Sequence, residues 1–191
     1  RATYLFRNTG LLETATLAAI KRFFLTTEFE SRHHSENHEL LFRTSRYLMG
    51  KTFWDESFEA YGKTGAELAK EDADWLRHFI RFRARRGWGE FDSSCYFQPD
   101  WECLISLFDY CQEAPEEIAE ADNEIHRLAH QMLDVLLADM VVDSINGMYC
   151  GAHGRIYQHH ALDHKNGSTY PLQYLYFGNV DPETMAGRGT L

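Results

Sequence analysis

The sequence has no apolar run of 18 or more residues, so no segment is long and apolar enough to form a membrane-spanning helix. It also lacks a Cys-x-x-Cys pair, which excludes a zinc ribbon and a thioredoxin-like redox site. Basic residues are in deficit, with 19 Lys and Arg against 29 Asp and Glu and a net charge of −10. This balance argues against a protein that binds nucleic acid through bulk charge.

No basic-then-apolar signal layout opens the chain, and no low-complexity tract or linker divides it. The chain begins with Arg1, so we expect a mature form or a piece cut from a longer chain. Its 191 residues, 44% of them hydrophobic, suffice to bury the core of one domain. We therefore expect a single domain over residues 1–191, whole or as a fragment of a longer chain.

The four cysteines, Cys95, Cys103, Cys111 and Cys150, are too few for a disulfide framework in a chain of this length. Cys103 and Cys111 lie eight positions apart in a helix-like stretch, which separates them by more than about 10 Å along the helix axis. They should therefore not bridge each other, and we expect the cysteines to be small buried thiols.

Helical periodicity dominates the sequence, because apolar residues recur at intervals of three and four. Gly50 is a predicted helix C-cap, and Pro115 is predicted to open the last helix. After Gly167 the period fades, and residues 169–178 are predicted to form a strand or an irregular wall. The pattern predicts five helices, over residues 11–25, 36–49, 66–86, 101–111 and 116–145.

This element order predicts an all-α fold of consecutive antiparallel helix pairs. Such helical hairpins form an (α/α)n toroid or part of one. A full toroid of about six hairpins needs roughly 300 residues, so we expect a smaller or partial toroid here.

Three polar segments between the predicted helices carry candidate site residues. The first covers residues 32–38, where Ser35 is a predicted N-cap. Asn37 and His38 then lie in the first helical turn, beside the end of the helix dipole that favours an anionic group. The three histidines of this segment lack the His-Glu-x-x-His spacing of a metal site, and a polar helix cap with exposed histidines is the simpler interpretation.

The second segment, residues 87–96, contains Trp88, Glu90, Asp92 and Tyr96. Glu90 and Asp92 suit a general acid and base, as in a glycosidase, but such residues also bond loop amides routinely. A tyrosine normally holds its proton until pH about 10. Tyr96 therefore needs nearby cations or concerted proton transfer to act as a catalyst.

The third segment, residues 147–157, contains glycines that let the backbone turn tightly around His153 and Arg155. Arg155 is suited to bidentate binding of a carboxylate or sulfate, and equally to tying loop carbonyls together. Tyr157 ends the segment as one of several aromatic residues near loops, which either stack on a sugar or belong to the core.

Residues 35–41, 87–96 and 151–157 together resemble the α/α-toroid polysaccharide lyases, the group that includes alginate lyases and heparinase-like enzymes. In that group an Asn-His pair on one helix works with a Tyr some fifty-odd residues later. Here Asn37 and His38 form the pair, and Tyr96 follows His38 by 58 positions. The resemblance covers roughly residues 31–160.

The resemblance implies β-elimination at a uronic acid. Asn37 would neutralise the carboxylate, and His38 would take the C5 proton. Tyr96 would protonate the leaving oxygen, or act as both base and acid on substrates of the opposite C5 configuration. The residues expected to contact substrate are Glu36, Trp88, Glu90, His153, Arg155 and Tyr157.

The same resemblance implies a secreted or periplasmic enzyme that acts on an anionic polysaccharide or oligosaccharide and needs no cofactor and no metal. Two alternatives remain. One is a glycoside hydrolase on an α/α scaffold, with Glu36, Glu90 or Asp92 as its carboxylates. The other is a non-catalytic helical domain that binds carbohydrate or packs against the rest of a larger protein.

Overall fold

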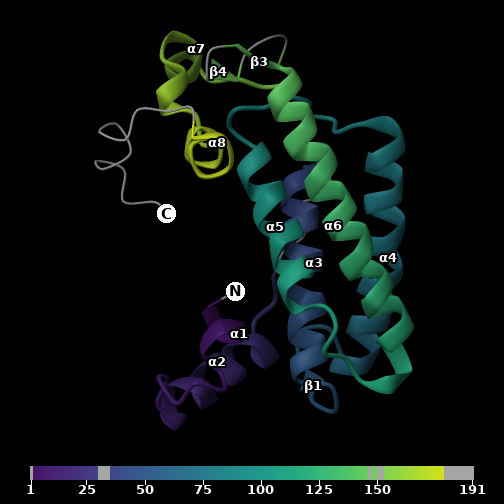
Figure 1. Cartoon of the computed structure of the whole chain (residues 1–191). Helices are drawn as coiled ribbons and strands as arrows, with labels where there is room; N and C mark the ends of the chain where they lie inside the picture. Colours follow the sequence, from purple (N-terminus) through teal and green to yellow (C-terminus); the bar gives the residue numbers. More distant parts are fainter. Residues whose placement is uncertain (1, 30–34, 146–147, 150–152, 179–191) are drawn as a thin grey trace.

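The computed structural model describes residues 2–29, 35–145, 148–149 and 153–178, which form a mostly helical structure (Figure 1). The all-α prediction is confirmed for these residues. The helices are α1 (Ala2–Phe6), α2 (Thr14–Thr26), α3 (Glu36–Thr52), α4 (Gly65–Arg86), α5 (Phe97–Tyr110), α6 (Ala119–Val142), α7 (Gln158–Leu162) and α8 (Tyr170–Phe177). Two 3₁₀ turns, η1 (Glu116–Ile118) and η2 (His164–Asn166), and two antiparallel pairs, β1 (Ser57–Phe58) with β2 (Lys63–Thr64) and β3 (Ser144–Ile145) with β4 (Met148–Tyr149), complete it.

Helices α3, α4, α5 and α6 form a four-helix bundle in which consecutive helices run antiparallel (Figure 1). Helix α3 packs on α4 and α5, and α6 packs on the same two helices, so the four close into a ring of contacts. The start of α3, the loop between α4 and α5, and the end of α6 therefore all lie at one end of the bundle. The three polar segments of the sequence meet at that end.

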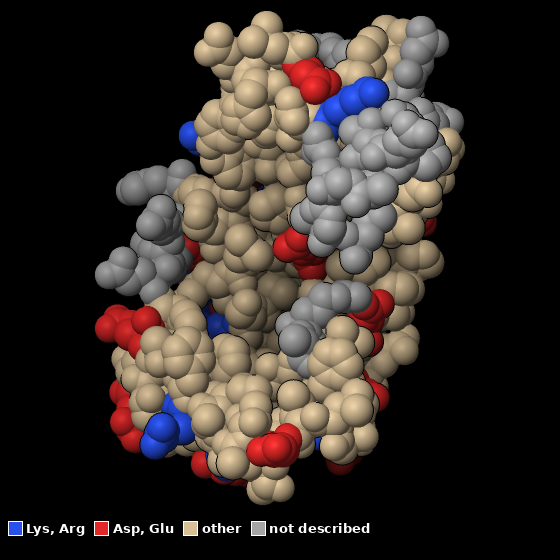
Figure 2. Space-filling view, turned by 90° about the vertical axis from the view of Figure 1, so that its left-hand side faces the viewer, with Lys and Arg blue, Asp and Glu red and all other residues tan. Residues whose placement is uncertain are grey.

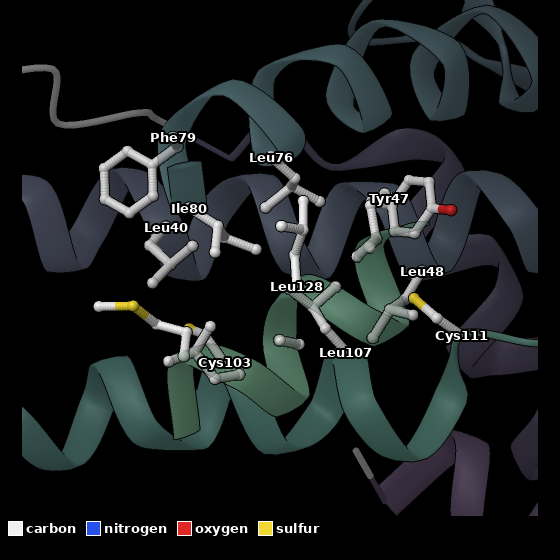
Figure 3. Packing of buried hydrophobic residues seen from close by; sticks show 14 of the residues in the cluster. Leu40, Tyr47, Leu48, Leu76, Phe79, Ile80, Cys103, Leu107, Cys111 and Leu128 are labelled. Atoms are coloured by element: carbon white, nitrogen blue, oxygen red, sulfur yellow. The ribbon is translucent and has the colours of Figure 1, made fainter. Parts of the chain in front are cut away.

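The core lies between the four bundle helices, where leucines from each helix point toward one another (Figure 3). Leu40, Leu76 and Leu107 are fully buried, and Leu128 of α6 is 9% exposed. These residues belong to the apolar stripes at intervals of three and four that the sequence shows. Removal of this apolar surface from water is the main force that holds the bundle together.

Helices α1 and α2 lie beside one end of the bundle, and α7 and α8 lie beside the other (Figure 1). Figure 2 shows the face between them, which is hollowed at its centre and formed there mostly by residues other than Lys, Arg, Asp and Glu. None of the helices in the described part of the chain combines the length and the apolar composition needed to cross a membrane.

The prediction that Gly50 caps the end of a helix is wrong, because α3 continues to Thr52. A Cβ atom at position 50 would lie 2.8 Å from the carbonyl oxygen of Gly65, at the start of α4. Glycine is therefore needed here for the close approach of two helices rather than for a left-handed turn.

The prediction of a strand or irregular wall at residues 169–178 is also wrong, because residues 170–177 form α8. Pro171 lies in the first turn of this helix, where its missing N–H costs nothing. Gly178 follows in the left-handed conformation, with φ 64°, and ends it. The β-favouring aromatic residues of this segment hid a helix whose two ends carry ordinary helix signals.

A buried carboxylate, Asp122 of α6, holds the bundle together at the end opposite the polar segments. Its Oδ1 accepts hydrogen bonds from Tyr47 Oη and Lys51 Nζ of α3, both at 2.5 Å, and its Oδ2 accepts one from the Gln112 N–H at 2.6 Å. The side chains of Lys51 and Asp122 are each only 1% exposed. Burial raises the pKa of the nearby Tyr47 phenol, so that side chain acts only as a donor.

The buried pair predicts a large effect of a single substitution. Lys51→Met removes the cation and leaves Asp122 charged inside the protein, so we expect the free energy of unfolding to fall by about 3–5 kcal/mol. Lys63→Met is the matched control, because Lys63 pairs with Glu71 at the surface, where the two side chains are 46% and 39% exposed respectively. Surface ion pairs of this kind contribute about 1 kcal/mol or less to the free energy of unfolding. Urea unfolding of the two variants measures this, and equal losses would contradict the prediction.

Candidate functional site

Glu36 ties the start of α3 to the loop between α4 and α5. Its Oε1 accepts a hydrogen bond of 2.7 Å from the backbone N–H of Glu90, and its Oε2 lies 2.8 Å from Arg83 Nη2 at the end of α4. Gly89 leaves room for this contact, because a Cβ atom there would lie 3.3 Å from Glu36 Oε1. The Glu36 side chain is only 9% exposed, so its main role in this structure is to join the start of α3 to the end of α4 and to the loop that follows α4.

The segment from His153 to Tyr157 packs directly on the same loop. The Gly154 N–H donates a 2.7 Å hydrogen bond to the Phe91 carbonyl, and a Cβ atom at position 154 would lie 2.8 Å from the Phe91 nitrogen. Only glycine fits this contact without a backbone shift. Ser93 Oγ also donates to the Arg155 carbonyl at 2.9 Å. Two segments about sixty residues apart therefore form one layer.

Asp92 and His153 stabilise that layer rather than face a ligand. The backbone of Asp92 is left-handed, with φ 51°, a conformation that Asp tolerates better than most residues. Its Oδ1 accepts a 2.9 Å hydrogen bond from Tyr149 Oη, and its carbonyl oxygen is hydrogen-bonded to His153 Nδ1. Burial of Tyr149, and after it the negative charge of Asp92, raise the pKa of the Tyr149 phenol.

A pair of tyrosines lies at the surface of this layer. The hydroxyls of Tyr96 and Tyr157 are 2.6 Å apart, and the Arg155 guanidinium carbon lies 4.9 Å from the centre of the Tyr96 ring and 5.6 Å from that of Tyr157. The hydrogen bond to Tyr157 is the main cause that raises the pKa of Tyr96, and Arg155 opposes it. Tyr96 therefore keeps its proton at neutral pH.

A polar cleft of about 690 Å³ opens beside these residues, between α3, α4 and the two loops. Trp75 and Phe79 form its aromatic wall, with stacked rings 4.6 Å apart. The residues that line the cleft are Ser35, Glu36, Glu39, Arg43, Trp75, Phe79, Arg83, Gly89, Glu90 and Arg155. Its size lies within the usual range of about 300–1,000 Å³ for small-molecule sites.

Sequence reasoning missed the aromatic wall of the cleft. Trp75, Phe79 and Arg83 follow one another at intervals of four on α4, which reads as part of a core stripe. The signal that could have identified them is Arg83 at the end of that stripe, since a charged side chain there marks the edge of the core. Trp88, expected to contact substrate, is half-buried and packs its ring edge-on against Phe79 at 5.9 Å instead of lining the cleft.

Arg155 is the cation of the cleft that is most available to a ligand. It is 51% exposed, and its ion pair with Glu90 Oε1 is 3.3 Å long. Arg83 is paired with Glu36, and Arg43 is bonded to Glu39 at 2.8 Å and to the fully buried Asp72 at 2.9 Å. Carboxylate binding by Arg155 therefore requires only an exposed and weak ion pair to exchange.

Asn37 and His38, the expected catalytic pair, do not lie in this cleft. Asn37 is 2% exposed, and its Oδ1 accepts a hydrogen bond from Ser35 Oγ. His38 Nδ1 lies 2.8 Å from the same hydroxyl, and its ring lines a separate pocket of about 410 Å³ whose walls are mostly aromatic. No hydrogen bond among the described residues joins either side chain to Tyr96. The physical reason is that successive helical residues project about 100° apart.

The described residues contain no group of three His, Cys, Asp or Glu side chains arranged to hold a metal ion. The neighbours of the expected pair, His33 and His34, lie outside the residues that the structure describes.

A buried acid lies behind the cleft. Asp100 of α5 is 6% exposed, and its Oδ1 has no hydrogen-bond partner among the described residues. Burial raises its pKa well above the ordinary value, the negative charges of Glu36 and Glu90 raise it further, and Arg83 opposes them. These surroundings therefore favour the protonated form of Asp100.

This raised pKa predicts a pH-dependent stability. The folded state retains a proton that the unfolded chain releases above pH about 3.9, so the stability contributed by Asp100 is lost as pH rises from there toward the folded-state pKa. Asp100→Asn cannot ionise, so we expect the variant to gain stability relative to the wild type as pH increases from 4 to 8. Urea unfolding at several pH values tests this, and parallel stability curves would show that the prediction is wrong.

Comparisons of the chain with protein-family models, with curated proteins and with solved structures find no match.

Proposed function

We propose that this end of the bundle is the active site of a polysaccharide lyase that cleaves a uronic-acid-containing chain by β-elimination. The observation that carries the proposal is the Tyr96–Tyr157 hydroxyl pair beside the exposed Arg155 and the polar cleft. Two phenols that can carry a proton, Tyr96 and Tyr157, thus lie beside Arg155, which can bind a carboxylate, although they come from segments far apart in the sequence. We further propose that the antiparallel helix pairs are part of an α/α toroid, and that the enzyme is secreted or periplasmic, where such polysaccharides occur.

The first requirement of the reaction is to offset the charge of the uronate carboxylate, because only then is the C5 proton acidic enough to leave. Arg155 meets this requirement in the proposal by exchanging its 3.3 Å contact with Glu90 for a bidentate contact with the substrate. It takes the role that the resemblance implies for Asn37, because Asn37 is only 2% exposed and does not line the cleft. Trp75 and Phe79 line the cleft and offer apolar ring surface for contact with a neighbouring sugar.

The second requirement is transfer of a proton from C5 to the leaving oxygen. We propose that the Tyr157 oxygen takes the C5 proton while its own proton passes to Tyr96, which protonates the glycosidic oxygen. The relay needs no free phenolate, which agrees with the raised pKa of Tyr96. It replaces His38 as the base, because His38 lines another pocket.

A second candidate function is glycoside hydrolysis, and the observation in its favour is that Glu36 and Glu90 line the same cleft as the aromatic wall. Glu36 is committed to the Glu90 N–H and to Arg83, which leaves Glu90, at 27% exposed, as the available carboxylate. Asp92 is bonded to Tyr149 and is a weaker candidate. Glu39 also lines the cleft but is bonded to Arg43, so the described cleft residues offer no free second carboxylate, and hydrolysis is our second candidate. Carbohydrate binding without turnover is the third.

The relay predicts that both phenols are needed for turnover. Tyr96→Phe and Tyr157→Phe each remove one hydroxyl and keep the ring, so we expect kcat to fall by about 10²–10⁴ with KM nearly unchanged. The measurement is the ultraviolet absorbance of the unsaturated product from a panel of uronate polysaccharides. Tyr176→Phe is the matched control, because Tyr176 is a 40% exposed tyrosine of α8 that packs on Trp101.

The two main readings give different results in the same assay. A hydrolase would release reducing ends without ultraviolet absorbance, and Glu90→Gln would impair it far more than Tyr96→Phe. Near-normal production of unsaturated ends by Tyr96→Phe would end the lyase proposal. Binding of the polysaccharide with no product of either kind would leave the carbohydrate-binding reading.

A further inference from the structure

A cysteine and a histidine that take no part in the proposed relay form a close pair next to it. Cys95 Sγ lies 3.0 Å from His160 Nδ1 of α7. Cys95 is half-buried and stands one residue before Tyr96, the N-cap of the 14-residue helix α5. The positive end of that helix dipole favours a negative sulfur at this position. A nucleophile and a base within hydrogen-bond reach are the usual signature of an activated thiol.

The other described cysteines lack these features. Cys103 and Cys111 are each 2% exposed, and burial raises the pKa of both thiols. They are therefore protonated and shielded at neutral pH. Cys150 lies outside the residues that the structure describes. Among the described thiols, Cys95 differs in exposure, in its basic neighbour and in its place at a helix start.

The surrounding contacts hold the pair in place. Ser168 Oγ lies 2.8 Å from the Cys95 carbonyl and 2.9 Å from the Ser94 carbonyl, which fastens the segment after α7 to the start of α5. The ring of His160 packs edge-on against Tyr157 at 5.7 Å. The imidazole is thus positioned by contacts on more than one side, so the distance to the sulfur does not depend on the Cys–His contact alone.

We propose that Cys95 is a nucleophilic thiol with His160 as its base, and that the pair is a modification site for small disulfides. With the imidazole proton on Nε2, the lone pair of Nδ1 faces the sulfur and accepts the thiol proton. The thiolate then attacks one sulfur of the disulfide, a new S–S bond forms, and the other half leaves as a thiolate. No further oxidant is needed. The proposal is independent of the lyase reaction.

The test uses dithiodipyridine, a neutral aromatic disulfide whose released thiopyridone absorbs light, so Arg155 does not attract the reagent by charge. The whole chain carries Cys150→Ser, which leaves only thiols that the structure describes. An ordinary thiol is only a few per cent thiolate at pH 7, so a thiol that has passed its proton to a base reacts up to about thirtyfold faster. We expect one fast equivalent per chain and two that react only after unfolding.

Cys95→Ser should abolish the fast equivalent. His160→Gln keeps a polar side chain but cannot take the proton, so we expect it to slow that equivalent by at least about tenfold. Circular dichroism and the unfolding midpoint verify that both variants are folded. A fast equivalent that survives Cys95→Ser would overturn the proposal. An unchanged rate of the fast equivalent in His160→Gln would also overturn it. If that variant in addition had a lower unfolding midpoint, the Cys95–His160 contact would be structural only.

Discussion

The position of α3 along the bundle axis is the constraint on which both the fold and the candidate site depend. Near its end, Tyr47 and Lys51 are bonded to the buried Asp122 of α6. At its start, Glu36 is bonded to the Glu90 N–H and paired with Arg83 of α4. Both anchors are short polar contacts with little exposure to water, where an unpaired charge is costly. A shift of α3 along its axis would break both anchors together.

The candidate site follows from this constraint because hydrogen bonds connect its two loops, one after the other, to the start of α3. The loop after α4 is fixed by Glu36, and the segment around Arg155 is fixed in turn on that loop by the Gly154–Phe91 contact. The tyrosine pair and Arg155 are the outermost part of this layering. Their geometry thus depends on a chain of contacts that starts at the first turn of α3.

The electrostatics of the site come from carboxylates whose surroundings differ. Glu36 and Glu90 each have a cationic partner, whereas Asp100 is buried behind them without a hydrogen bond to Oδ1. Burial and the neighbouring negative charges raise the pKa of Asp100 well above its ordinary value and so favour its protonated form. Although the chain as a whole is acidic, Arg155 is the most exposed charged side chain among those that line the cleft. A site that is open to an anionic ligand is therefore compatible with a net charge of −10.

The sequence by itself determined the helical class and the approximate place of the bundle helices, because helical periodicity is local and the apolar stripes of α3 to α6 are continuous. It also pointed to the polar segments that meet at one end. It failed where distant contacts decide the outcome. Gly50 serves packing against Gly65 instead of a cap. The error at residues 170–177 has a local cause, because the β-favouring aromatics outweighed the helix signals of Pro171 and Gly178 in the prediction. The direction of each site side chain was likewise a tertiary property. Asn37 and His38 adjoin Glu36 in the chain, yet only Glu36 reaches the loop that carries Tyr96, because helical rotation turns neighbouring residues toward different elements.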